Sequence, residues 1–477
     1  MKTLVFKALS VGFSRWLKAC RLMARAATGI VLLVFAAMSG IDNVQAAEEL
    51  LLPDTTPEIV DISSIRMPRD FSRVDFYLLT VDVGDKVWDN FGHTALRVVD
   101  NESNSDLVFN WGLFDISVGN VTFASNFLRG ILNYQLGVSP PAWELGRYER
   151  EQRTVWQDKI NLTNAQKATL YQRLAWNLRE ENIVYSYQYF FDNCTTRVRD
   201  YLNEALGGRL QEQSRALSPR TFRDEVKAHY ASVPYVSVSL DILMNSRIDR
   251  RMSQWEEMFL PLRLRQELTR FASDVVRNGQ RLPLLDESRI LMEFQPPAEK
   301  PDGYYFLGAF LFVPVMVLFF NLKKIPLASF SSQTGFTFRA PGLSYRLLGL
   351  LTLALSLVSG IYGLIMTVGW LESGHLDLHH NLNLLLFWPT DLLGFFFALR
   401  WLFSGRGCAM SKTSHSLIIF YLLCHLLAAV AYILMAVTGI AEQNVSSLLI
   451  FVVPALTGLT LLVWNAGFSA IRRISFS

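Results

Sequence analysis

Charged residues are scarce in this chain. They make up 18% of its 477 residues, whereas hydrophobic residues make up 51%. A soluble protein usually carries about a quarter charged residues, so part of this chain does not face water. The net charge is only +3 and no basic patch is interleaved with aromatic residues, which excludes a polybasic nucleic-acid-binding protein. The composition therefore indicates a membrane protein with a sizeable soluble part.

Cysteine is scarce as well. The chain has 4 cysteines, which are too few and too scattered for a disulfide framework or a zinc knuckle. They are Cys20, Cys194, Cys408 and Cys424. With 28 Gly, 17 Pro and no internal repeat or low-complexity tract, the chain is not of a collagen-like or disordered class.

The first 46 residues have the pattern of a secretory signal peptide. A basic stretch precedes an apolar run over 28–40, and small residues end the segment at Val44–Ala46. We expect residues 1–46 to be a signal peptide that is cleaved after Ala46; the alternative is an uncleaved anchor. In both cases residue 48 onward lies outside the cytoplasm.

Five apolar runs follow residue 303, and each is long enough to cross about 30 Å of hydrocarbon. They are 304–321, 347–371, 382–403, 415–438 and 446–470. Lys and Arg lie between the first two runs, after the third and after the fifth, and the other two loops contain none. The positive-inside rule therefore places residue 300 outside the cytoplasm, as the signal peptide does. We expect an all-α five-helix transmembrane domain over 304–470.

The part before these runs has ordinary soluble composition and a mixed α+β pattern. Strands are predicted at 74–82, 93–99 and 107–111, and the last two form a hairpin around a polar turn. A helix is predicted at 121–132. Residues 209–300 are predicted to be a helical, membrane-proximal extension.

Cys194 is predicted to lie in the first turn of an amphipathic helix. Asn193 is a favourable N-cap, apolar residues recur at helical spacing after it, and Gly207 with Gly208 ends the helix. Another helix is predicted to begin with a capping box of Thr163 and Gln166. A helix N-terminus favours a thiolate and can stabilise an oxyanion, so Cys194 is a candidate nucleophile.

A histidine would complete such a site by accepting the thiol proton. His93 opens a predicted strand directly after Gly92, where the backbone allows close approach. His229 is the other histidine before the apolar runs, and it stands in a sequence with no such signal. The alternative is that Cys194 is a small buried hydrophobic residue and His93 a structural one.

Several motifs occur in order along the chain. They are Asn-Phe-Gly-His-Thr-Ala-Leu-Arg-Val at 90–98, Phe-Asn-Trp-Gly-Leu-Phe-Asp at 109–115, a Tyr-rich run ending in Asp-Asn-Cys-Thr-Thr-Arg at 185–197, and Trp-Glu-Glu-Met-Phe-Leu-Pro at 255–261. Asn381, Asn383 and Pro389 extend the pattern. With these motifs the chain resembles the Lnb-type lipoprotein N-acyltransferases. It is more distantly similar to the permuted papain-like NlpC/P60 and lecithin–retinol acyltransferase folds, in which a strand histidine precedes the helix cysteine.

The resemblance implies a permuted papain-like catalytic domain over 47–208, with its active site in the periplasm of a bacterial inner-membrane protein. Cys194 would take a fatty acyl chain from a membrane phospholipid as a thioester and pass it to the N-terminal amine of a lipoprotein. His93 would be general base and acid, with Asn110 as the third residue if the hairpin register allows. No cofactor and no metal is implied. The residues expected near the site or the substrate are Asp192, Asn193, Arg197, Tyr185 and Tyr189.

The loops between the apolar runs add further candidates. His375 belongs to a run with an Asp and two more His, which we expect to contact lipid headgroups or solvent rather than a metal. Asn381 and Asn383 stand at the mouth of the third run and are expected to bond backbone or a neighbouring helix. Asp391 lies deeper, and an ionisable residue within a membrane segment is a functional candidate. Arg197 has an alternative as well, an ion pair with Asp200 on the helix surface.

Two other functions are consistent with the residues. One is a cysteine peptidase or amidase that acts on cell-wall peptide, since the NlpC/P60 group performs that chemistry. The other is a non-catalytic envelope receptor or assembly factor, in which Cys194 is a buried helix residue. Five membrane helices argue against a soluble cell-wall substrate, because a single anchor would suffice.

Overall fold

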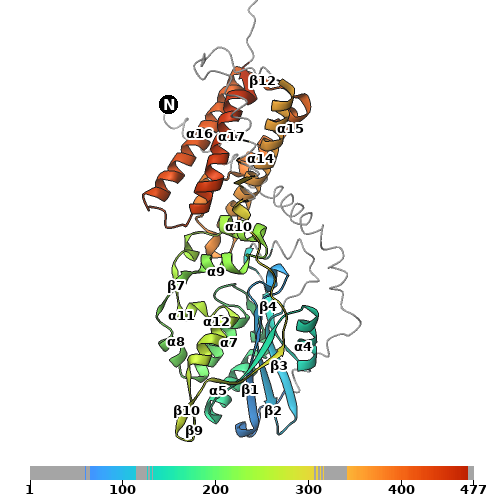
Figure 1. Cartoon of the computed structure of the whole chain (residues 1–477), viewed down its shortest axis with the longest axis vertical. Coiled ribbons are helices and arrows are strands. Elements are labelled where there is room, and N and C mark those ends of the chain that lie inside the picture. The colour runs from blue at the N-terminus through green and yellow to red at the C-terminus, as the bar shows by residue number, and fades with distance from the viewer. Residues whose placement is uncertain are drawn as a thin grey trace, which may run out of the picture. The chain divides into compact units, whose positions relative to one another are not determined.

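The structure, a computed structural model, describes residues 65–113, 133–305 and 341–470, with a few single positions beside these ranges. The chain divides into two compact units (Figure 1). One, the sheet unit, takes its described residues from Val34–Val236 and Arg250–Lys300; the other, the helical unit, takes them from Ser237–Asp249 and Pro301–Ser477. The expected signal peptide and most of both the helix at 121–132 and the first apolar run lie outside the described residues.

The sheet unit is built on seven strands in the order β11-β5-β1-β2-β3-β4-β6, and every neighbouring pair is antiparallel. The strands are β1 (Val74–Val81), β2 (His93–Asp100), β3 (Ser105–Leu113), β4 (Asn133–Ser139), β5 (Val155–Ile160), β6 (Val184–Ser186) and β11 (Leu285–Met292). The three predicted strands are confirmed as β1, β2 and β3, because each carries the β-branched and aromatic residues that suit a pleated, buried surface.

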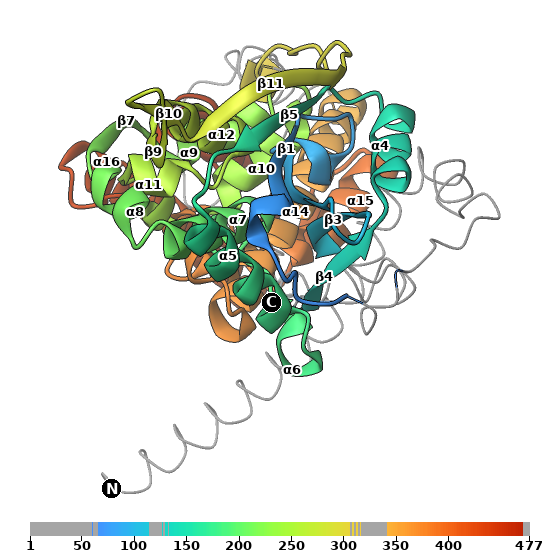
Figure 2. The same ribbon diagram turned by 90° about the horizontal axis from the view of Figure 1, so that it is seen from below.

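Helices cover both faces of this sheet (Figure 2). On one face α5 (Asn164–Asn177), α7 (Cys194–Ala205) and α12 (Pro261–Arg270) pack on a large core that includes Phe76, Leu96 and Trp111. On the other, α4 (Pro141–Arg150) places Tyr148 against Val81 and Val155. The β-strand period of two sends alternate residues of β1 to these two layers.

The predicted helix starts are confirmed by their caps. Thr163 and Gln166 form the capping box that opens α5. Asn193 caps α7 by accepting from the backbone N–H of Thr196 at 2.8 Å. The helix ends before Gly207 and Gly208, whose φ values of 67° and 84° are left-handed and suit glycine.

The region 209–300 is not the helical extension that we expected. Its helices are α8 (Arg209–Gln213), α9 (Phe222–His229), α10 (Pro234–Leu243), α11 (Gln254–Glu257) and α12, and its strands are β7 (Leu217–Thr221), β8 (Arg251–Ser253), β9 (Ala272–Arg277), β10 (Gln280–Pro283) and β11. Strand β11 pairs with β5 at the sheet edge, and Met258, Leu264 and Leu268 join the main core. The exposed polar residues of an edge strand hide the alternation that would reveal it in the sequence.

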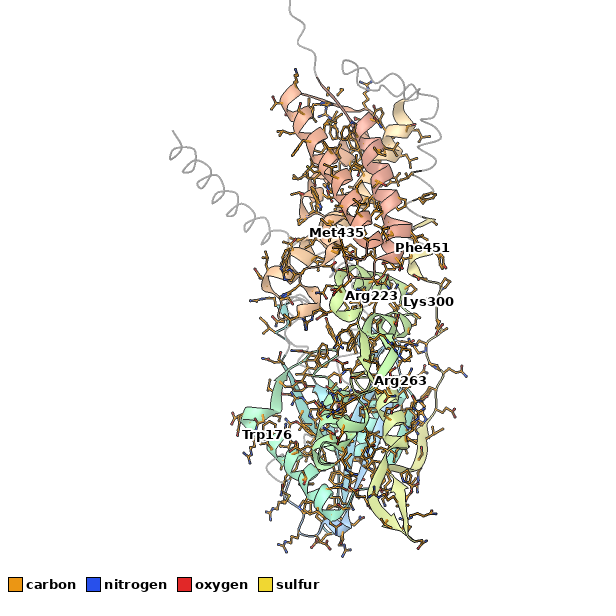
Figure 3. The ribbon with its side chains drawn as sticks, turned by 90° about the vertical axis from the view of Figure 1, so that its left-hand side faces the viewer. Trp176, Arg223, Arg263, Lys300, Met435 and Phe451 are labelled. Carbon is orange, nitrogen blue, oxygen red and sulfur yellow. The ribbon has the colours of Figure 1, made fainter. Side chains whose placement is uncertain are left out.

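The helical unit contains three described helices that are long and apolar enough to cross a membrane: Gly342–Glu372, Lys412–Val437 and Leu448–Gly467. The first lies within α14 (Pro341–Glu372) and the second is α16, whereas the third contains α17 (Val453–Leu462) between two π-helical turns. In Figure 3, Met435 marks α16, and Trp176 and Arg263 mark α5 and α12 of the sheet unit.

The third apolar run is not one continuous helix. The segments Leu376–Leu385 and Pro389–Ser404 meet at an angle of 59°, and α15 (Gly394–Ser404) is the regular part of the second. Pro389 follows this break and lacks the N–H group that an uninterrupted helix would use there. The described residues therefore support a mixed α+β unit with apolar helices after it, and not the count of five helices.

Candidate active site

Cys194 is the first residue of α7, where unpaired backbone N–H groups and the helix dipole favour negative charge. Its side chain is buried, with 8% of its surface exposed. The adjacent Thr195 has its hydroxyl 3.1 Å from that of Thr94 in β2, which fastens the start of the helix to the sheet. The cysteine is thus held at a rigid junction.

His93 is the first residue of β2 and faces Cys194 across Gly112. A Cβ atom placed on Gly112 would lie 3.8 Å from Cε1 of His93 and 3.9 Å from Cβ of Cys194. Gly112 has a φ of +91°, so glycine is the residue that this backbone favours. The structure therefore brings together the two residues that the sequence predicts as nucleophile and base.

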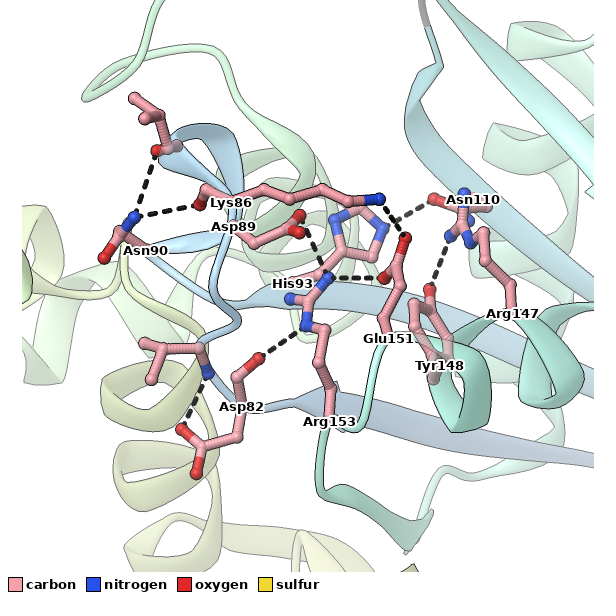
Figure 4. Close-up of polar contacts among 12 residues, drawn as sticks. Asp82, Lys86, Asp89, Asn90, His93, Asn110, Arg147, Tyr148, Glu151 and Arg153 are labelled. Atoms are coloured by element: carbon pink, nitrogen blue, oxygen red, sulfur yellow. Dashed lines mark hydrogen bonds and ion pairs between the residues drawn. The ribbon is translucent and has the colours of Figure 1, made fainter. Parts of the chain in front are cut away.

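Asn110 lies beside His93 on the next strand, in the register that pairs it with Ala95. Its Oδ1 is 2.6 Å from Nε2 of His93 (Figure 4). Its Nδ2 donates to Oε2 of Glu144 at 3.0 Å. A carboxylate only accepts, so the Asn110 oxygen must face the histidine, and Nε2 carries the proton. The other ring nitrogen, Nδ1, is then unprotonated and can accept a proton.

Glu144 is a site residue that the sequence reasoning missed. It is 1% exposed and also accepts from Ser139 Oγ at 2.8 Å and from Arg147 at 2.9 Å. Arg147 in turn donates to the Tyr148 hydroxyl at 3.0 Å. Pro141 at the first position of α4 with an acidic residue in the first turn is a helix-start signal, which would have placed Glu144 on a helix beside the predicted strands.

Burial shifts the pKa values of both members of the dyad of Cys194 and His93. Desolvation, with the charges of Arg147 and Arg153, lowers the pKa of His93 to about 3. Burial raises the pKa of the Cys194 thiol, although the Thr94 and Thr195 N–H groups and the Thr195 hydroxyl oppose that rise. Both directions favour a neutral imidazole beside a neutral thiol. The arrangement suits a base that accepts the proton during attack, and not a preformed ion pair.

A second polar network lies behind His93. Arg153, which is 3% exposed, contacts Asp89 and Glu151 at 3.2 Å each, and Lys86 reaches Glu151 at 3.7 Å (Figure 4). Burial raises the pKa of Asp89 to about 6 against the lowering effect of Arg153. These residues anchor the loop that leads into His93.

The residues expected around the cysteine form a compact cluster. Arg197 pairs with both carboxylate oxygens of Asp192, at 2.5 and 2.7 Å, and lies 4.1 Å above the ring of Tyr185. Asp200 instead pairs with Arg199 at 2.8 Å. Asn193 donates to the carbonyl of Tyr189 at 2.8 Å. The alternative pairing of Arg197 with Asp200 is therefore wrong.

Other candidates lie elsewhere. Nδ1 of His229 lies 2.9 Å from the Glu225 carbonyl oxygen, and its ring packs at a tilt against Phe91, with the ring centroids 5.2 Å apart. His375, Asn381 and Asn383 belong to the helical unit. Among the described residues, no group of three or more His, Cys, Asp and Glu side chains could hold a metal ion.

The two asparagines bind a segment that the sequence assigns to the membrane-proximal extension. Asn381 donates to the carbonyls of Ile242 and Leu243 at 2.9 and 2.8 Å, and Asn383 donates to that of Ile242 at 2.8 Å. Their side chains satisfy the C-terminal carbonyls of α10, so Ser237–Asp249 packs as part of the helical unit.

Asp391, within the third run, accepts hydrogen bonds from the hydroxyl groups of Ser359 and Tyr421 at 2.5 and 2.6 Å.

Comparison with known proteins finds a match to one family model. No curated protein and no solved structure matches this chain, so the papain-like permutation stays a prediction. Residues 66–228 match the family model described as the Lnb N-terminal periplasmic domain, and this range contains Cys194, His93, Asn110 and Glu144. The part of the chain that holds the candidate site is therefore similar to the Lnb N-terminal periplasmic domain.

Proposed function

We propose that the protein is a membrane-anchored thiol acyltransferase that moves a fatty acyl chain from a phospholipid to the N-terminal amine of a lipoprotein. The observation that carries the proposal is the placement of Cys194 at the start of α7, opposite a histidine whose tautomer is held by Asn110 and Glu144. A nucleophile, a base and a residue that orients the base are the parts that acyl transfer requires.

In the first step the Cys194 sulfur attacks the ester carbonyl of the phospholipid. The thiol proton passes to Nδ1 of His93 as the S–C bond forms, and the carbonyl electron pair moves to oxygen. The intermediate then collapses, the ester C–O bond breaks, and the imidazolium returns its proton to the departing alcohol. The products are an acyl thioester on Cys194 and a lysophospholipid.

In the second step the free amine of a lipoprotein attacks the thioester. Neutral His93 accepts the ammonium proton as the C–N bond forms, and the thiol of Cys194 leaves with a proton from the imidazolium. The amine has to be unprotonated to attack, and neutral His93 then takes the proton that the nitrogen carries once the C–N bond has formed.

Two features support a lipid as acyl donor. The same chain carries three described helices long and apolar enough to cross a membrane, which would keep the domain beside its substrate. Cys194 also belongs to an apolar cluster with Tyr134 and Tyr185, so the surroundings of the nucleophile are apolar, as an acyl chain requires.

The experiment that tests the proposal uses the full-length protein in detergent with a phospholipid labelled in its acyl chain. We expect a label on Cys194 that hydroxylamine releases, and none on Cys194→Ala. A wild-type protein that takes no label, or a label that survives in Cys194→Ala, would sink the thioester mechanism.

The acceptor is tested separately, by mass spectrometry of lipoprotein N-termini in a deletion strain. Loss of the N-linked acyl chain supports lipoprotein acylation. Unchanged lipoproteins with altered cell-wall peptides would favour the peptidase or amidase alternative. Wild-type growth and lipoproteins in both the Cys194→Ala and His93→Ala strains would favour a receptor or assembly factor.

A further inference from the structure

Tyr185 carries a buried hydroxyl group that is not part of the hydrogen bonds among His93, Asn110 and Glu144. The residue lies in the middle of β6, opposite Tyr134 of β4, and is 7% exposed. Among the residues that the structure describes, its hydroxyl has no hydrogen-bond partner. A buried hydroxyl without a partner costs free energy, and native proteins leave few of them, so this one calls for an explanation.

The hydroxyl belongs to the surroundings of the nucleophile. Arg197, one helical turn after Cys194, lies 4.1 Å above the Tyr185 ring, so the ring packs under the first turn of α7. Tyr185, Tyr134 and Cys194 are members of one buried cluster. The thiolate charge of Cys194 adds to burial in raising the pKa of Tyr185 well above its ordinary value. Negative charge at the cysteine is thus felt by this hydroxyl.

We propose that Tyr185 is a catalytic residue whose hydroxyl donates a hydrogen bond to the carbonyl oxygen of the acyl group that Cys194 attacks. The inference rests on the proposed function and adds a residue to it. When the S–C bond forms, the carbonyl electron pair becomes an oxyanion; Tyr185 and the backbone N–H groups at the start of α7 would stabilise it. The tyrosine keeps its proton throughout, and the electron pair returns to carbon when the C–O bond breaks.

Tyr185 is suited to this role because it remains a donor. Burial holds its hydroxyl in the protonated form at neutral pH. Its ring is buried, with the Arg197 guanidinium 4.1 Å above it, so the hydroxyl loses little freedom when the substrate arrives. A donor held in place within an apolar site stabilises an oxyanion more than water would.

The test compares Tyr185→Phe with Tyr171→Phe, each in the full-length protein. Both remove one hydroxyl from the same core, but the Tyr171 hydroxyl donates to the Arg66 carbonyl at 2.9 Å. We measure acylation of Cys194 by labelled phospholipid and, separately, its alkylation by iodoacetamide. Alkylation displaces iodide from a saturated carbon and forms no oxyanion, so it reports on thiol reactivity alone.

We expect Tyr185→Phe to acylate about 100-fold more slowly than wild type and to alkylate at the wild-type rate. Its melting temperature should be unchanged or higher, because the lost hydroxyl has no partner among the described residues, whereas Tyr171→Phe should melt lower and acylate normally. Wild-type acylation by Tyr185→Phe, or an equal fall in acylation and alkylation, would overturn the inference. If wild-type protein takes no acyl label at all, the proposed function fails, and with it the acyl carbonyl as the partner of Tyr185.

Discussion

Oδ1 of Asn110 lies 2.6 Å from Nε2 of His93, and this contact decides which ring nitrogen can act as a base. The asparagine cannot turn its amide around without placing its oxygen against the Glu144 carboxylate, which now accepts from Nδ2 at 3.0 Å. His93 therefore presents Nδ1 as the free base. The hydrogen bonds from Glu144 through Asn110 to His93 thus form a relay that fixes the tautomer of the base.

Replacing Asn110 should disable the base without removing it. In Asn110→Ala the histidine loses the acceptor that fixes its ring, and we expect acylation of Cys194 to fall about 100-fold. Asn110→Asp should fold less well at pH 8, because its carboxylate would face Glu144, whose Oε2 lies 3.0 Å from the present Nδ2 atom. Acylation by labelled phospholipid and thermal unfolding measure the two effects. Wild-type acylation in Asn110→Ala would argue against the relay.

Glu144→Gln should weaken the same relay at the hydrogen bond between Glu144 and Asn110. A glutamine amide can present either its oxygen or its nitrogen, so Asn110 would no longer be held in one orientation, and Arg147 would lose a charged partner. We expect acylation to fall about 10-fold and the free energy of unfolding to drop by about 1–3 kcal/mol. Glu149→Gln is the matched control, because Glu149 lies exposed on the same helix. Equal activity in the two variants would contradict the role of Glu144.

Gly112→Ala should affect the site and Gly207→Ala should not. Both glycines have positive φ, +91° and +67°, so an added methyl group strains either backbone by about 1–2 kcal/mol. At Gly112 the methyl group also lies 3.8 Å from the His93 ring and 3.9 Å from Cys194, whereas at Gly207 no described atom beyond its chain neighbours lies within 4 Å. We expect both variants to melt lower and only Gly112→Ala to lose acylation. Parallel losses of acylation would show that strain alone matters.

The pH dependence of alkylation should reveal a neutral dyad. The thiolate is the reactive form, and burial raises the pKa of Cys194 above its ordinary value of 9.0. The iodoacetamide rate should therefore climb about tenfold per pH unit from pH 5 to pH 8, with no plateau. Cys194→Ala supplies the background from the other cysteines. A rate that levels off at acidic pH would indicate a thiolate–imidazolium pair instead.

Stability should fall as the solution is acidified, partly through His93. Its pKa is lowered from 6.5 to about 3 in the folded protein. Between these values the unfolded chain binds the proton more tightly, so folding stability present above pH 6.5 is lost as pH falls toward 3, by at most about 1.4 kcal/mol per unit. Asp89 acts in the opposite sense, since its pKa is raised to about 6. Urea denaturation of His93→Gln should show a shallower decline than wild type; parallel curves would contradict a buried neutral His93.

Much of the local structure could be read from the sequence. The strands at β1, β2 and β3, the capping box of α5 and the start of α7 at Cys194 were all predictable, because periodicity, caps and glycine stops act within a few residues. The same signals also predict Cys194 as the nucleophile and His93 as the base. The edge strand β11 was missed because polar residues interrupt its pattern.

Local sequence patterns sufficed to place Cys194 at the start of a helix and His93 at the start of a strand, and to show that apolar segments follow the soluble part. The tertiary structure alone decided that Gly112 lies between them, that Glu144 holds Asn110, and that Tyr185 keeps an unpaired hydroxyl among the described residues. It also assigned Ser237–Asp249 to the helical unit. The reason is separation: Asn110 is 34 positions from Glu144 and Thr94 is 101 from Thr195, and no local propensity specifies which distant elements pair.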